Sequence, residues 1–299
     1  MSDTTRTVGV VGLGIMGSTM SRHLLDAGFD VVGYDIDDAR MREHRERGGD
    51  VGTTPEDVAT RSDVVITSLA SIDAFTDVVG GPTGLAAAGN GGLVVDTSTL
   101  PLDVKLAARD TLAKAGRVLL DCTISGTGAQ LLDKDVAVYI SGDDAHAKQT
   151  VTPVLQAFAR SQYDVGPFGN GSKFKYIANL LVAIHNLSTA EAFLLAERAG
   201  LDRDLMLQVI SDGAGSSRMF EVRGPLMIAD SYDEATMKVA VFQKDIHIID
   251  SFAKDLHSPT PLFTQATMFY EAAMAQGRAG QDTACLLPVL RQMAGGEAD

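Results

Sequence analysis

A lysine and an asparagine stand four residues apart in a stretch that reads Gly169-Asn170-Gly171-Ser172-Lys173-Phe174-Lys175-Tyr176-Ile177-Ala178-Asn179. On a helix, Lys175 and Asn179 would share one face, because side chains at this spacing are neighbours. An amine and a carboxamide side by side can hold an alcohol, and the amine can take the hydroxyl proton. The pair therefore predicts acid–base chemistry on a hydroxyl group, if other elements bring a reacting partner to it.

The segment that holds this pair has the composition of a long helix. No glycine or proline occurs from Ser172 to Ala199, and Gly200 follows where a helix would end. A helix of this length spans roughly 40 Å. Its apolar residues fall on more than one side, so we expect more than one partner to bury it. They are Leu180, Leu181, Ile184, Leu187, Ala190, Ala192, Leu194 and Leu195.

The residues before and after this helix differ in pattern. The first half alternates β-branched runs with helical segments, which is typical of a parallel, doubly wound sheet. Candidate strands are Thr7 to Val11, Asp30 to Tyr34, Val64 to Ser68, Leu93 to Asp96, Val118 to Cys122 and Ala137 to Ser141. After the long helix only helical patterns follow, at Asp204 to Ser211, Tyr232 to Leu256 and Phe263 to Gln276. The sequence predicts an α/β Rossmann-type domain over 1–167, and an all-α domain for substrate binding and oligomerisation over 168–299.

A glycine motif follows the first candidate strand and reads Gly12-Leu13-Gly14-Ile15-Met16-Gly17. Such glycines allow a tight turn, close approach of backbone to a pyrophosphate, and close packing of helix on strand. The motif alone is weak evidence for a dinucleotide site, because glycine-rich turns also occur for structural reasons. Here a strand precedes it, a helix from Ser18 to Ala27 follows, and Asp35 ends the next strand, so the context favours a dinucleotide site.

Asp35 favours NAD over NADP as the cofactor. A carboxylate at this position accepts hydrogen bonds from the ribose hydroxyls and repels a 2′-phosphate. Arg40, with three more arginines in the next seven residues, is the competing signal, because arginines attract that phosphate. We interpret these arginines as a solvated helix face that also carries glutamates.

Four motifs, taken in order, resemble those of the β-hydroxyacid dehydrogenase family, which includes 3-hydroxyisobutyrate dehydrogenase and tartronate semialdehyde reductase. They are the glycine motif, Asp121-Cys122-Thr123-Ile124-Ser125-Gly126, the segment with Lys175 and Asn179, and Lys244-Asp245. The likeness covers nearly the whole chain. It implies a reversible hydride transfer between the carbinol carbon of a short 3-hydroxyacid and C4 of a nicotinamide.

The resemblance implies that Lys175 is the general acid/base and that Asn179 orients the substrate. The chemistry is consistent, because an alcohol that loses hydride must also lose its proton. Partial desolvation beside a cationic nicotinamide pushes the pKa of a lysine downward, toward working pH. The alternative for any lysine is an ordinary place on a helix surface, which is our interpretation of Lys173.

The substrate residues also follow from the resemblance. Ser125, Gly126 and Thr127 resemble a turn that binds a carboxylate through backbone N–H groups and a hydroxyl. Thr127 departs from the glycine common in the family, and Ala178 departs from a common asparagine, while a purely structural turn is the alternative. Phe220 resembles a residue that closes the pocket in relatives acting on threonate-like sugar acids, although a core aromatic explains it almost equally well.

The remaining cofactor residues are placed by the same resemblance. Leu69 and Ala70, after the third candidate strand, and Thr99, after the fourth, border the cofactor. The family usually has proline where Ala70 stands, which makes this loop less rigid. Lys244 approaches the nicotinamide end of the site, and its alternative is a helix-face lysine paired with acids.

Composition excludes several other classes of function. The formal net charge of −14 disfavours nucleic acid or an anionic membrane as the main partner. No run of about 18 apolar residues is available to span a bilayer, and the first residues lack the apolar region of a secretory signal. The two cysteines and the histidines show no metal-ligand spacing. We expect a cytoplasmic protein that uses no metal.

These observations predict an NAD-dependent oxidoreductase that acts on a small hydroxyacid resembling 3-hydroxyisobutyrate, glycerate or threonate. An imine reductase on the same scaffold is disfavoured, because such relatives generally lack the lysine. A non-catalytic dinucleotide-binding regulator is disfavoured by the presence of both Lys175 and Asn179. A homodimer or homotetramer is expected, because the long apolar helix offers more surface than one small domain can cover. The identity of the hydroxyacid, the stereochemistry and the physiological direction stay open.

Overall fold

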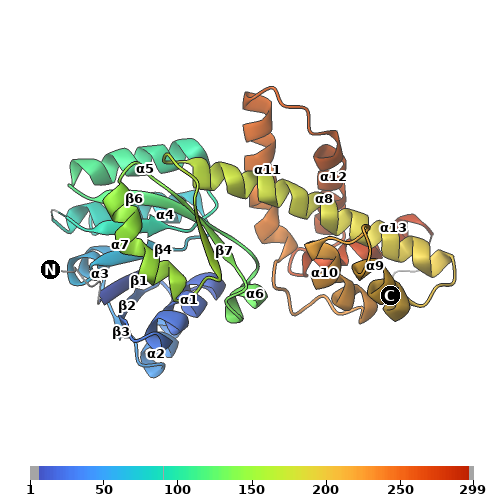
Figure 1. Cartoon of the computed structure of the whole chain (residues 1–299), viewed down its shortest axis with the longest axis horizontal. Helices are drawn as coiled ribbons and strands as arrows, with labels where there is room; N and C mark the ends of the chain where they lie inside the picture. The colour runs from blue at the N-terminus through green and yellow to red at the C-terminus, as the bar shows by residue number, and fades with distance from the viewer. Residues whose placement is uncertain (1–6, 90, 296–299) are drawn as a thin grey trace. The chain divides into compact units, whose positions relative to one another are not determined.

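The computed structural model describes residues 7–89 and 91–295, and Figure 1 labels its helices and strands. The chain divides into two compact units, Met1–Lys175 and Tyr176–Asp299. The boundary falls inside the long helix α8 (Asn170–Arg198), whereas the sequence analysis placed it before this helix. The first turn of α8 is bonded to strands of the first unit and therefore belongs to that unit.

The first unit alternates strands with helices, as the β-branched runs predicted. Its strands are β1 (Thr7–Val11), β2 (Asp30–Tyr34), β3 (Asp50–Val51), β4 (Val64–Thr67), β5 (Leu93–Asp96), β6 (Val118–Ser125), β7 (Ala137–Ser141) and β8 (Ser161–Asp164). Its helices before α8 are α1 (Ile15–Asp26), α2 (Asp38–Glu46), α3 (Pro55–Arg61), α4 (Ile72–Gly80), η1 (Leu85–Ala87), α5 (Leu102–Lys114), α6 (Gly128–Leu132) and α7 (Ala145–Gln156).

The eight strands form one sheet in the order β3-β2-β1-β4-β5-β6-β7-β8. All neighbouring strands are parallel except β6 and β7. The sheet is therefore mostly parallel, as expected, but β7 runs antiparallel to β6, and β3 and β8 were not among the candidate strands. The chain between β6 and β7 holds only the short helix α6, and a parallel crossover needs a dozen or more residues.

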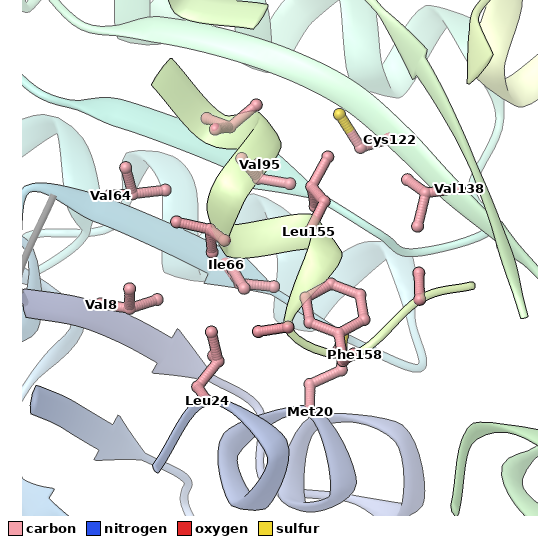
Figure 2. Close-up of a cluster of buried hydrophobic side chains, with 14 of the residues drawn as sticks. Val8, Met20, Leu24, Val64, Ile66, Val95, Cys122, Val138, Leu155 and Phe158 are labelled. Atoms are coloured by element: carbon pink, nitrogen blue, oxygen red, sulfur yellow. The ribbon is translucent and has the colours of Figure 1, made fainter. Parts of the chain in front are cut away.

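Each face of the sheet is covered by its own hydrophobic core. On one face, valines and isoleucines of β1, β4 and β5 pack with α1 and α7, where Met20, Leu24, Leu155 and Phe158 are buried (Figure 2). On the other face, the alternate strand residues pack with α3, α4 and α5. Strands buried on both faces read as continuous apolar runs, which is why the sequence identified them.

The second unit is helical, as predicted. It contains most of α8 and then α9 (Arg203–Ser211), α10 (Arg218–Ile228), α11 (Val239–Asp255), α12 (Pro261–Ala275), η2 (Thr283–Cys285) and α13 (Leu286–Met293). Helix α11 begins at Val239 rather than at Tyr232, because Lys238 instead forms a β-bridge with Asp282. Helix α10 was not predicted, since its Gly224 and Pro225 obscure the helical pattern.

Helix α8 is long and apolar enough to cross a membrane when judged by length and composition alone. Core helices of soluble proteins pass the same test. Tyr176, Ala183, Ala190 and Phe193 of α8 lie in the hydrophobic core of the second unit. Burial of this kind accounts for part of the apolar composition of the helix, while Ile177, Leu181 and Leu195 of the same helix stay exposed.

Candidate active site

The glycine turn after β1 has the geometry that its sequence predicted. Gly12 has a φ of +93°, and a Cβ at this position would lie 2.3 Å from the backbone oxygen of Ser68. Its N–H donates to the carbonyl of Tyr34 at 2.8 Å. A Cβ on Gly17 would lie 1.8 Å from the carbonyl oxygen of Gly12. Both positions therefore require glycine, one for the turn and one for close packing of α1 on β1.

The N-terminus of α1 is open to a ligand. Gly14 is the N-cap, it provides no side-chain cap, and the first turn contains no acidic residue. A Cβ on Gly14 would meet no atom closer than Nη1 of Arg40, at 3.9 Å, and Ile15 is 60% exposed. Uncapped N–H groups at the start of a twelve-residue helix suit a phosphate.

Asp35 follows β2 and is held against this turn. Its Oδ2 accepts the N–H of Leu13 at 2.7 Å and a hydrogen bond from Arg40 Nη1 at 3.2 Å. Its Oδ1 accepts the N–H of Asp37 at 3.0 Å. The side chain is 6% exposed, while that of Arg40 is 48% exposed. The carboxylate is thus fixed beside the turn, and the arginine next to it can still reach solvent or a ligand.

One register row crosses the sheet at the ends of β1, β4 and β5. It pairs Val11 with Thr67, Thr67 with Asp96, and Asp96 with Asp121. Residues in register on neighbouring strands point to the same face, and Thr67 Oγ1 donates to Asp96 Oδ1 at 2.8 Å. The glycine turn begins directly after this row, so polar side chains stand at the edge where ligands of α/β sheets bind.

The loops after β4 and β5 are tied together at this edge. Ser98 donates to Asp96 Oδ1 through its Oγ at 2.7 Å and through its N–H at 3.2 Å. The N–H of Leu69 in turn donates to Ser98 Oγ at 2.9 Å. Leu69 and Thr99 are half-buried, and Ala70 is exposed. Three candidate cofactor residues thus lie in loops that share one hydrogen-bond network.

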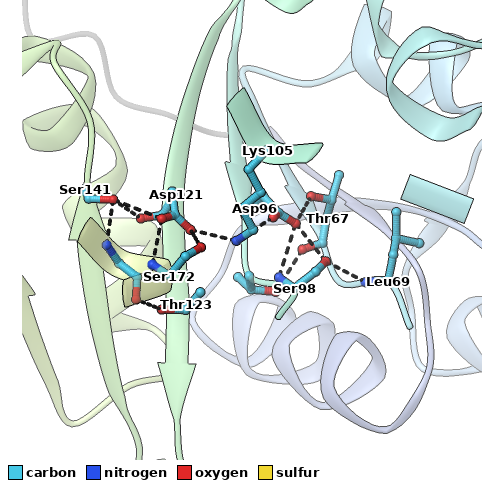
Figure 3. A network of polar contacts seen from close by, with 11 residues as sticks. Thr67, Leu69, Asp96, Ser98, Lys105, Asp121, Thr123, Ser141 and Ser172 are labelled. Atoms are coloured by element: carbon cyan, nitrogen blue, oxygen red, sulfur yellow. Dashed lines mark hydrogen bonds and ion pairs between the residues drawn. The ribbon is translucent and has the colours of Figure 1, made fainter. Parts of the chain in front are cut away.

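The start of α8 is bonded to the same row (Figure 3). The N–H of Ser172 donates to Asp121 Oδ2 at 2.7 Å, and its Oγ donates to Asp121 Oδ1 at 3.0 Å. The N–H of Gly171 donates to Ser141 Oγ at 2.9 Å. A Cβ on Gly171 would lie 2.5 Å from the carbonyl oxygen of Asp121. Half-buried Lys175 follows within one turn, so its backbone position is fixed by strands of the sheet.

The turn after β6 uses its polar groups internally. Gly126 has a φ of +142°, and a Cβ there would lie 2.6 Å from Val136 Cγ1. Thr127 is the N-cap of α6 and forms a capping box with Gln130. Its hydroxyl accepts the N–H of Gln130 at 3.4 Å and donates to Oε1 of the same residue at 3.3 Å. The added hydroxyl of Thr127 therefore has a structural role, which supports the alternative of a structural turn, and its contact with substrate stays a prediction. Ser125 stands half-buried at the end of β6.

In the second unit, Asn179 is oriented by an aspartate. Its Nδ2 donates to Asp245 Oδ2 at 2.7 Å, and Lys244 Nζ lies 3.4 Å from Asp245 Oδ1. A carboxylate only accepts hydrogen bonds, so the nitrogen of the amide must face Asp245. The Oδ1 of Asn179 therefore points away from Asp245 and presents an acceptor.

Phe220 belongs to the hydrophobic core of the second unit. Its side chain is 3% exposed, and its ring stacks on Phe193 with a centroid separation of 5.7 Å. Burial thus supports the alternative of a core aromatic for Phe220, and its place in the substrate site stays a prediction.

Comparison with known proteins decides the family. Residues 7–166 match the family model of the NAD binding domain of 6-phosphogluconate dehydrogenase. Residues 169–290 match the model described as NAD-binding of NADP-dependent 3-hydroxyisobutyrate dehydrogenase. The L-threonate dehydrogenase of Cupriavidus necator is 33% identical over 95% of this chain and 96% of its own. The chain belongs to the β-hydroxyacid dehydrogenase family.

Solved structures agree with this assignment. A 3-hydroxyisobutyrate dehydrogenase from Salmonella typhimurium superposes with a TM-score of 0.86 at 28% identity, over 95% of this chain and 99% of its own. The Mycobacterium tuberculosis 3-hydroxyisobutyrate dehydrogenase, solved with L-serine, gives a TM-score of 0.83 at 26% identity, over 96% and 99%. The Rossmann-like unit and the helical unit of this chain are therefore those of its family.

Three residues hold candidate site residues in place, and the sequence analysis did not predict this role for any of them. Asp121 was noted only as a motif position, Ser172 only as the start of a helix, and Asp245 only as the neighbour of Lys244. A charged residue inside an apolar strand, as in Leu119-Leu120-Asp121-Cys122, was the available signal. The partners of Asp121 depend on how the strands are paired, which short stretches of one sequence do not reveal.

The glycine turn gives the first prediction. Gly12→Ala should abolish measurable NAD binding, because the new Cβ would collide with the backbone of Ser68. Gly28→Ala is the matched control, since Gly28 has a similar φ of +88° but nothing within 4 Å of a Cβ. Both variants carry the cost of a left-handed alanine, about 1 kcal/mol. Titration with NADH, followed by the fluorescence of the reduced cofactor, should show binding only in the control, and equal binding by both variants would contradict the role of the turn.

Proposed function

We propose that the protein catalyses reversible, NAD-dependent hydride transfer between the carbinol carbon of a small hydroxyacid and C4 of the nicotinamide. One observation carries the proposal. The turn that bears Lys175 is bonded to Asp121, in the same register row from which the glycine turn and the loops with Leu69 and Thr99 depart. A general base is thereby held at the edge of the sheet that carries the candidate dinucleotide residues.

In this proposal Lys175 acts on the substrate hydroxyl. Its neutral amine takes the hydroxyl proton as the hydride leaves the carbinol carbon, which yields a carbonyl and an ammonium group. In the reverse direction the ammonium returns the proton to the forming alcohol. The bound nicotinamide supplies the hydride acceptor or donor. Asn179, oriented by Asp245, accepts a hydrogen bond from the substrate through its Oδ1.

The substrate class rests on the relatives and on the turn after β6. A relative is named L-threonate dehydrogenase, and solved relatives are named 3-hydroxyisobutyrate dehydrogenase. We propose that Ser125 and Gly126 bind the carboxylate of such a hydroxyacid, and that Lys244 approaches the nicotinamide. Because Thr127 is used in its cap, Ser125 is the hydroxyl left to meet the acid at this turn.

We further propose that the protein is a cytoplasmic homodimer or homotetramer without a nucleic-acid or membrane partner. Support for self-association comes from large apolar side chains of the second unit that this single chain leaves exposed. Leu195 is 72% exposed, Leu201 59%, Leu205 58% and Val209 58%. A second copy of the chain would remove such a surface from water.

Lys175→Ala should lower kcat by about 10³-fold, within the range that general acid–base catalysis contributes. Lys173→Ala is the matched control, because Lys173 Nζ donates to Asn170 Oδ1 at 3.4 Å and the residue has no part in the proposed chemistry. Steady-state reduction of NAD by L-threonate, 3-hydroxyisobutyrate and glycerate provides the measurement.

The same assay separates the rival functions. Retention of most of the kcat in a folded Lys175→Ala variant would refute the acid/base role. Activity with cyclic imines but with none of the hydroxyacids would identify an imine reductase. Tight NAD binding without turnover of either substrate class would identify a non-catalytic regulator.

Asp35 gives a prediction about cofactor choice. Asp35→Ser should raise the ratio of kcat/KM for NADP to that for NAD by at least about tenfold, since removing a carboxylate beside the ribose relieves repulsion worth about 1.4 kcal/mol. Asp37→Ser removes a charge two residues away and keeps an N-cap for α2, where Asp37 Oδ1 accepts the N–H of Ala39 at 2.9 Å. The Asp37→Ser control should keep the wild-type ratio of the two kcat/KM values. An equal change of this ratio in both variants would refute the assignment of Asp35 as the residue that selects NAD.

A further inference from the structure

Lys105 is wholly buried on α5 between two aspartates that are also wholly buried. Its Nζ lies 2.7 Å from Asp121 Oδ1 and 2.9 Å from Asp96 Oδ2, and all three side chains are 0% exposed. Burial by itself lowers the pKa of Lys105, but the two carboxylates more than offset this effect and raise the pKa above its usual value. The lysine is therefore an ammonium ion inside the protein.

The two carboxylates are satisfied in different ways. Asp121 accepts hydrogen bonds from the N–H and Oγ of Ser172 and from Ser141 Oγ, in addition to Lys105. Asp96 Oδ1 accepts from hydroxyls and an N–H group, whereas Asp96 Oδ2 faces the Lys105 ammonium at 2.9 Å. The ion pair with Lys105 is thus what offsets the burial of this oxygen.

The three charges join two parts of the candidate site (Figure 3). From Asp96 the network continues through Ser98 to the N–H of Leu69, in the loops that border the proposed cofactor position. From Asp121 it continues to Ser172, one turn before Lys175. Lys105 is the link between the two branches, because its Nζ contacts both carboxylates.

We propose that Lys105 is a positioning residue that holds the loops after β4 and β5 in fixed register with the first turn of α8. It acts through Asp96 and Asp121 and does not touch the substrate. The proposal rests on the proposed function, in which Lys175 is the acid/base. A buried ion cluster adds little stability beyond what apolar side chains of similar volume provide, so its specific effect is the direction of its contacts.

Lys105→Met tests the proposal. It leaves two buried carboxylates side by side without a cation, so the melting temperature should fall by several degrees, about 5 °C or more. At a temperature where the variant is fully folded, kcat should fall by about 10²-fold with a smaller change in KM, because a shift of about 1 Å at the reacting groups has this effect.

Arg117→Met is the matched control for stability. Arg117 is also a buried cation, 4% exposed, and it stands just before the other end of β6, where its Nη2 donates to the carbonyl of Ala88 at 2.9 Å. This variant should lose thermal stability as well but keep its kcat within about threefold, since surface and core sites away from the chemistry act through folding alone. An equal loss of kcat in both variants at full folding would overturn the proposal.

A double variant separates positioning from charge balance. Lys105→Met with Asp96→Asn restores the net charge of the cluster and keeps an oxygen acceptor at position 96. The melting temperature should recover in large part, while kcat should stay low, because the bridge between the side chains at positions 96 and 121 remains cut. Recovery of kcat together with the melting temperature would show that Lys105 only neutralises charge, and would overturn the positioning role.

Hydrogen exchange gives a readout that does not depend on activity. The N–H groups of Gly171 and Ser172 donate to Ser141 and Asp121, so a peptide containing them should exchange slowly in the wild type and in Arg117→Met. In Lys105→Met it should exchange at least about tenfold faster. Unchanged exchange would overturn the proposal whatever the kinetics show. If Lys175→Ala instead kept its kcat, the proposed function would fail, while faster exchange in Lys105→Met would still support the anchoring of α8.

Discussion

The candidate site depends on one constraint, which is that a carboxylate buried in the middle of a sheet must be matched by donors and a cation. Asp121 lies in β6 with no exposed surface. Ser172, Ser141 and Lys105 meet its requirement. Leaving such a group unmatched costs several kcal/mol, so the chain cannot begin α8 elsewhere without a large penalty. The first turn of α8 is therefore placed by the sheet, and Lys175 is placed with it.

A carboxylate that fixes a neighbouring group occurs again in each of the two units. Asp35 accepts the N–H of Leu13 and so holds the glycine turn in shape. Asp245 accepts a hydrogen bond from Nδ2 of Asn179, which leaves Oδ1 of the amide facing away from Asp245. In each case a carboxylate, which can only accept hydrogen bonds, orients a neighbour that can donate. Precise placement of donors and acceptors is what a reaction with coupled hydride and proton movement requires.

Local signals account for what the sequence predicted well. The glycine turn, the strand before it and Asp35 lie within thirty residues of one another, so short-range pattern was enough to place them. The long helix was visible because nothing between Ser172 and Ala199 breaks it. Strand β8, by contrast, reads Ser-Gln-Tyr-Asp and lacks an apolar run. Its place at the sheet edge comes from pairing with β7, which the sequence does not show.

Long-range partners account for what the sequence predicted poorly. The substrate roles given to Thr127 and Phe220 came from resemblance and stay predictions. The sequence did not show that Thr127 caps a helix or that the ring of Phe220 stacks on Phe193. Lys105 carries no local signal in the sequence, because its partners lie on two strands that come together only through their register. Network residues of this kind are found by geometry rather than by motif.

The most direct test measures whether deuterium passes from the carbinol carbon of a hydroxyacid to the nicotinamide. Carbon-deuterated L-threonate and 3-hydroxyisobutyrate would be incubated separately with the protein and NAD, and the reduced cofactor would be analysed by mass spectrometry. The account predicts that at least one of these hydroxyacids yields reduced cofactor carrying one deuteron at C4 of the nicotinamide. Reduced cofactor without deuterium, or none from either hydroxyacid although NAD is bound, would contradict direct hydride transfer from a small hydroxyacid.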